Sequence, residues 1–152
     1  MNLGLYKKAE LSFKEFLKTV FDDKNFLSEE MKEEMIKEAN QNIHRLKIPI
    51  KIEEAENDIR TGNFKKARPV IEKYIIEEEF KNHWVLYLDL GIIYNEIYME
   101  NEAIEILEEG LKLKPQSVDI INLLITIYKK LNDDEMISKY SKKLELIQRG
   151  EL

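Results

Sequence analysis

The sequence predicts an all-α protein of about eight helices. Along nearly the whole chain of 152 residues, apolar residues recur at three- and four-residue steps, which is the period of an amphipathic helix. Only five glycines and three prolines are present, and they fall mostly where a helix would end. An all-β protein needs turn residues about every ten positions. The scarcity of such residues therefore argues against strands and for helices joined by short connections.

The first part of the chain is expected to form three helices. The first lies near the N-terminus and is interrupted by the segment FDDKNFLS, residues 21–28. Ser28 is a good N-cap for a second helix over 28–46, because its hydroxyl accepts a free backbone N–H of the first turn. We expect Pro49 to end that helix or to open the next one. The third helix is short and closes at Thr61-Gly62-Asn63.

Five further helices follow in the second part of the chain. The first of them carries Ala67 and Ile71 and contains Pro69, which we expect to bend the helix or to delay its start. The other four are expected over 83–97, 101–113, 117–130 and 133–148. Asn101, Pro115 and the pair Asn132-Asp133 separate them.

Composition narrows the classes of function. With 30 acidic and 24 basic residues, the chain has a net charge of −6 and lacks the basic stripe of a nucleic-acid-binding protein. It has no cysteine, which excludes disulfides and thiolate metal sites and favours a reducing compartment. No segment resembles a signal peptide or is apolar enough to span a membrane. We therefore expect a cytoplasmic protein that binds neither nucleic acid nor membrane.

The most informative feature is a motif in the second half of the chain. It consists of Tyr87-x2-Leu90-Gly91-x2-Tyr94, then Ala103-x3-Leu107, then Pro115. Gly91 and Ala103 are small, which allows two antiparallel helices to approach closely. Larger apolar side chains fill the space around that contact. A second, weaker copy follows, with Leu124 and Tyr128 placed 34 residues after Leu90 and Tyr94.

This order and spacing resemble the tetratricopeptide repeat (TPR), with Tyr87 replacing the usual Trp and Leu107 the usual Phe. The resemblance implies a right-handed solenoid of helical hairpins, an α-α superhelix. It divides the chain into an N-terminal helical segment, 1–47, and repeats over 48–83, 84–117 and 118–151, packed as one domain. The best match is 84–117. In the degenerate units, the small packing residues are Ala9, Ala55 and Ala67.

By the same resemblance, the first helix of each hairpin lines a groove that holds a peptide or a helix. The candidate groove residues are Ile52, Glu56, Ile59, Val85, Leu88, Ile92, Asn95, Asn122, Thr126 and Lys129. The carboxylate-clamp subgroup of the family needs paired Lys, Arg and Asn on this surface. Because the candidate set has no arginine, we do not expect a clamp of that kind.

Two segments, 84–98 and 118–128, are apolar on almost every side. Such a helix is either covered on every side or forms a binding surface. Two explanations stay open: the helix over 28–46 folds back over the groove, or the groove binds an amphipathic helix or an extended peptide. A homodimer through the same surface would satisfy both.

No arrangement of side chains indicates catalysis, a metal or a cofactor. The two histidines, His44 and His83, have no acidic residue three positions before them, so the Glu-x-x-His ligand pattern is absent. Acidic runs at 29–34, 53–56 and 77–79 are expected to be solvated helix faces with nearby lysines. The sequence thus predicts a non-catalytic scaffold for another protein or peptide. The alternatives are a regulatory TPR domain that receives a signalling peptide, or an architectural homo-oligomer without a groove ligand.

Overall fold

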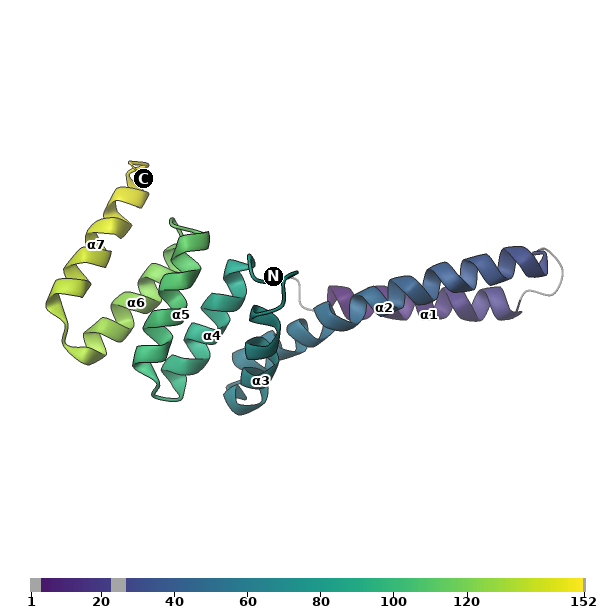
Figure 1. The fold of residues 1–152 in the computed structure, drawn as a ribbon, viewed down its shortest axis with the longest axis horizontal. Coiled ribbons are helices and arrows are strands. Elements are labelled where there is room, and N and C mark those ends of the chain that lie inside the picture. Colours follow the sequence, from purple (N-terminus) through teal and green to yellow (C-terminus); the bar gives the residue numbers. More distant parts are fainter. Residues whose placement is uncertain (1–3, 23–26, 152) are drawn as a thin grey trace. The chain divides into compact units, whose positions relative to one another are not determined.

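The computed structural model describes residues 4–22 and 27–151, which form seven helices and no strand (Figure 1). Their bounds are α1 Leu5–Asp22, α2 Glu29–Arg60, α3 Phe64–Ile75, α4 Trp84–Glu96, α5 Glu100–Leu113, α6 Val118–Leu131 and α7 Asp134–Gln148. The all-α prediction is confirmed for these residues. The middle of the expected interruption over 21–28, residues 23–26, lies outside them. Ser28 caps α2 as expected, since the backbone N–H of Met31 donates to its Oγ at 3.2 Å.

The prediction about Pro49 is wrong. Pro49 lies inside α2, a single helix of 32 residues, where the sequence analysis expects two helices. The apolar stripe continues across the proline, with Leu46 and Ile50 both half-buried, so packing on both sides holds the helix together despite one missing hydrogen bond. Pro69 does not delay α3, which starts at Phe64 and contains the proline, so of the two expected effects only a bend of the helix stays a prediction. The described residues therefore hold seven helices and not eight.

The chain forms two compact units, residues 1–57 and 58–152, and the boundary lies within α2. This boundary differs from the one expected between 47 and 48, because α2 runs through that position without a break.

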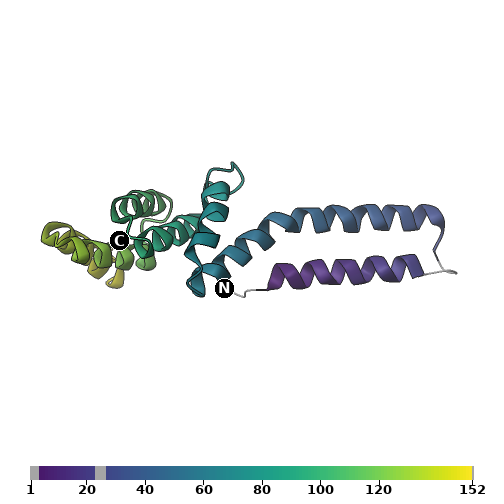
Figure 2. The ribbon, with the colours of Figure 1, turned by 90° about the horizontal axis from the view of Figure 1, so that it is seen from below.

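The first unit is an antiparallel hairpin of α1 and the part of α2 up to Asn57 (Figures 1 and 2). The buried apolar side chains of this hairpin are Val20, Ala39 and Ala55. At its open end, Lys7 Nζ lies 2.9 Å from Glu54 Oε1.

The second unit stacks α3 to α7. In this unit α4 contacts α3, α5 and α6, while α6 contacts α5 and α7. One cluster of its buried apolar residues consists of Ala103, Leu107, Leu111, Ile120, Ile121, Leu124, Ile125, Ile127, Tyr128 and Tyr140, and further buried apolar residues lie on α3 and α4. Contact with three helices accounts for much of the all-round apolarity of α4. A polar contact joins α3 to α4, because the Tyr94 hydroxyl donates to Glu72 Oε1 at 2.9 Å.

The close approach of α4 and α5 depends on two glycines. A Cβ at Gly91 would lie 2.4 Å from Leu107 Cδ2, and a Cβ at Gly110 would lie 2.9 Å from Tyr87 Cβ. Both distances are shorter than van der Waals contact, so a larger residue at either position would force its neighbours to move. Gly110 is absent from the sequence-based packing set, although it makes the same kind of contact as Gly91.

The other residues of that packing set differ in burial. Those that are buried are Ala55, Ala67, Leu90, Ala103, Leu107, Leu124 and Tyr128. Ala9, Tyr87 and Tyr94 are half-buried, while Pro115 is exposed between α5 and α6.

Candidate peptide-binding surface

The groove candidates on α4 and α6 occupy matching places in two hairpins. Trp84 and Val118, the first residues of α4 and α6, are 34 positions apart, and so are the first residues of α5 and α7, Glu100 and Asp134. α4 and α6 lie side by side, and Lys130 Nζ donates to Asn95 Oδ1 at 2.8 Å between them. Exposed and half-buried residues at equal places on the two helices therefore belong to one continuous surface.

The part of this surface on α4 is apolar. Val85, Leu88 and Ile92 are all half-buried. Leu88 also packs against the core of the second unit, so only part of its side chain faces outward. This part of the surface offers apolar contact area and no charge.

The part on α6 is polar. Asn122, Thr126 and Lys129 are exposed. The Thr126 hydroxyl donates to the backbone carbonyl of Asn122 at 2.9 Å, which fixes its orientation. Within the described part of the chain, the Asn122 carboxamide and the Lys129 ammonium have no hydrogen-bonding or ionic partner. Both groups are therefore available to a ligand.

Asn95 does not belong to the exposed surface, contrary to the sequence-based expectation. It is only 5% exposed. Its Oδ1 accepts from Lys130, and its Nδ2 donates to Glu96 Oε1 at 3.2 Å. The physical reason is that Lys130 on α6 donates a hydrogen bond to the carboxamide and ties it to the neighbouring helix. Asn95 thus joins two helices and is not a ligand-binding side chain.

The three groove candidates on α2 are divided between the two units. Ile52 and Glu56 lie in the unit 1–57, whereas Ile59 lies in the same unit as α4 and α6. All three are half-buried. Burial, together with the charge of Glu53, raises the pKa of Glu56. Of these three residues, only Ile59 is assigned by the fold to the unit that carries α4 and α6.

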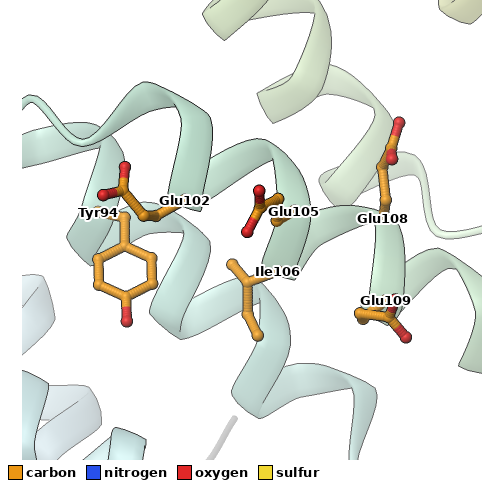
Figure 3. A pocket seen from close by; sticks show the side chains of 6 residues that line it. All are labelled: Tyr94, Glu102, Glu105, Ile106, Glu108 and Glu109. Atoms are coloured by element: carbon orange, nitrogen blue, oxygen red, sulfur yellow. The ribbon is translucent and has the colours of Figure 1, made fainter.

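Sequence reasoning missed a hollow of about 480 Å³ beside α5 (Figure 3). Its lining is Tyr94, Glu102, Glu105, Ile106, Glu108 and Glu109. The sequence carries a signal for this hollow, because its glutamates recur at three- and four-residue steps and so share one side of a helix. Glu108 accepts a hydrogen bond from the Tyr140 hydroxyl at 2.9 Å. This hydrogen bond and burial raise the pKa of Tyr140, burial being the larger cause.

In residues 4–22 and 27–151, no three His, Asp or Glu side chains are grouped so that they could hold a metal ion. Over the same residues, no helix combines the length and the apolar character needed to cross a bilayer. No protein-family model, curated protein or solved structure matches the chain.

Proposed function

We propose that the protein is a non-catalytic scaffold that binds a peptide or an amphipathic helix of another protein along the surface of α4 and α6. One observation carries this proposal. An apolar row on α4, Val85, Leu88 and Ile92, lies next to a polar row on α6, Asn122, Thr126 and Lys129, and a hydrogen bond holds the two helices together.

The chemistry of the two rows defines the ligand. Apolar side chains of the ligand would lie over Val85 and Ile92, where contact removes apolar area from water. Its polar or acidic side chains would face Asn122 and Lys129, whose amide and ammonium groups have no other partner among the described residues. An amphipathic segment meets both requirements at once.

A TPR-like architecture is part of the proposal. It is supported by the interval of 34 residues between equivalent helices and by the contact of Gly91 with Leu107 inside the first hairpin. Stacked hairpins place their first helices next to one another, which is the arrangement of α4 and α6.

The experiment is a selection of binding peptides from a displayed library of random linear peptides, with the purified chain as the target. Thr126→Trp places a bulky ring on the exposed row, and Ile92→Glu places a charge in the apolar row. Both variants should lose at least about tenfold in affinity for the selected peptides, because the ring of Thr126→Trp blocks the exposed row and the ligand would bury the charge of Ile92→Glu. Glu109→Gln, on α5, is the matched control and should bind as the wild type does.

Helicity measured by circular dichroism shows whether each variant is folded. Leu88→Glu is less suitable, since Leu88 also packs on the core. Selected peptides that bind folded Thr126→Trp and Ile92→Glu as tightly as the wild type would refute the assignment of this surface.

A further inference from the structure

The hairpin of α1 and α2 leaves much of its apolar surface uncovered. In residues 4–22 and 27–57, the exposed large apolar side chains are Leu5, Tyr6, Leu11, Phe16, Phe21 and Met31. Leu5 is 55% exposed and Phe21 is 65% exposed. Two helices alone can cover only one stripe on each other, so apolar side chains on their other sides stay in contact with water unless a further layer covers them.

A groove runs between α1 and α2 on one face of this hairpin, with a volume of about 490 Å³. Its lining is Ala9, Ser12, Phe13 and Phe16 from α1 and Glu38, Ala39 and Asn42 from α2. The two alanines are small, whereas Phe16 is a bulky side chain of the lining that is 39% exposed. The face thus carries both a recess and a projecting ring.

The charges beside this groove follow the same pattern on both helices. On α1, Lys8 lies four positions before Ser12 and Glu15 lies three positions after it. On α2, Glu38 lies four positions before Asn42 and Arg45 lies three positions after it. Residues at these spacings share one side of a helix. Each helix therefore carries opposite charges on either side of a central polar residue of the groove.

These four charged residues are exposed and available to a partner. Within the described parts of the hairpin, none of their charged groups takes part in an ion pair. Other charged residues of the hairpin are already paired, for example Lys14 with Glu10 at 2.8 Å.

We propose that this face binds the same face of a second copy of the chain, which makes an antiparallel four-helix dimer. The two-fold axis passes near Ser12 and Asn42, so that α1 lies antiparallel over α1 of the second copy and α2 over α2. In this arrangement Lys8 meets Glu15 of the second copy, and Glu38 meets Arg45. Phe16 of each copy faces the recess at Ala9 of the other.

The charges select this arrangement over the alternative. If the two-fold axis ran along the helices, α1 of one copy would lie over α2 of the second copy. Lys8 would then approach Arg45, and Glu15 would approach Glu38. Like charges at an interface disfavour a complex. The interface is self-complementary only in the antiparallel arrangement, as a two-fold dimer requires.

The first test uses the absence of cysteine in the chain. Ser12→Cys introduces a single thiol close to the proposed axis, and Lys14→Cys introduces one on the opposite side of α1. Under mild oxidation the full chain with Ser12→Cys should form disulfide-linked dimers much faster than the Lys14→Cys control. Light scattering after size exclusion should give about twice the mass of the 18.1 kDa chain at high concentration.

The second test exchanges charges. Glu15→Lys should raise the dimer dissociation constant at least about fivefold at low salt, because two attractive pairs become repulsive. Adding Lys8→Glu to Glu15→Lys should restore the wild-type constant, since the pair is then reversed. Glu33→Lys changes the charge equally at an exposed position on the other side of α2 and should have little effect.

A folded chain that is monomeric at every concentration would overturn the proposal. So would a dimer in which Lys14→Cys crosslinks as fast as Ser12→Cys. If the dimer of the variant with both Lys8→Glu and Glu15→Lys dissociates as readily as that of Glu15→Lys alone, the antiparallel arrangement is overturned.

Discussion

Lys130 Nζ on α6 lies 2.8 Å from Asn95 Oδ1 on α4, and this hydrogen bond joins the first helices of two consecutive hairpins. Asn95 is buried, whereas the neighbouring Lys129 is exposed and has no ionic partner among the described residues. Two adjacent lysines thus have different roles: Lys130 links α6 to α4 through a hydrogen bond, and Lys129 is available to a ligand.

Lys130→Met should lower the free energy of unfolding by about 1–2 kcal/mol, because the buried Asn95 carbonyl loses its donor. Lys129→Met removes the same charge at the adjacent position and should change the free energy of unfolding by less than about 0.5 kcal/mol. Urea unfolding followed by circular dichroism measures both values. Equal losses in the two variants would show that the hydrogen bond contributes nothing.

Gly91→Ala should destabilise the protein by about 1–3 kcal/mol, because the added methyl group would overlap Leu107. Leu107→Ala alone should cost about 2–5 kcal/mol through the cavity that it leaves in the core. In the double variant the new methyl group occupies part of that cavity. The double variant should therefore lose less stability than the sum of the losses in the two single variants. A loss equal to that sum would contradict the contact between Gly91 and Leu107.

Pro49→Ala should stabilise α2, because alanine restores a backbone hydrogen bond and removes a clash inside a helix that costs about 3 kcal/mol. Hydrogen exchange should show slower exchange of amides around position 49, and helicity should stay or rise. If Pro49 separated two helices, the same change would leave exchange unaltered at that point.

The stability of the second unit should fall in alkaline solution. Burial and the hydrogen bond to Glu108 raise the pKa of Tyr140 above its ordinary value near 10, so the folded state favours the protonated phenol. This contribution is complete below the unfolded pKa and is lost as the pH rises above about 10. Tyr140→Phe should make the free energy of unfolding less dependent on pH in that range. If the pH dependence of the free energy of unfolding stays the same in Tyr140→Phe, groups other than Tyr140 cause the loss of stability in alkaline solution.

The sequence predicted the features that depend on local spacing. The helical class follows from periodicity, and the tight contact at Gly91 follows from a motif in which every residue has a fixed interval to the next. The four helices from 84 onward begin within one residue of their expected starts.

Features that depend on distant residues could not be predicted. Pro49 obeys a local rule for ending helices, but packing along a helix of 32 residues outweighs it. Asn95 accepts a hydrogen bond from a residue 35 positions further along the chain, so no local pattern distinguishes it from a surface residue. Gly110 was missed because it lies in an acidic run, although it contacts Tyr87 closely.

The most direct test of the proposed surface is an NMR titration of the isotopically labelled full chain with a peptide selected from the library. We predict that chemical-shift changes concentrate on α4 at Val85 and Ile92 and on α6 at Asn122, Thr126 and Lys129. Saturable changes confined to other residues, such as the acidic hollow beside α5, would contradict the account and place the ligand elsewhere.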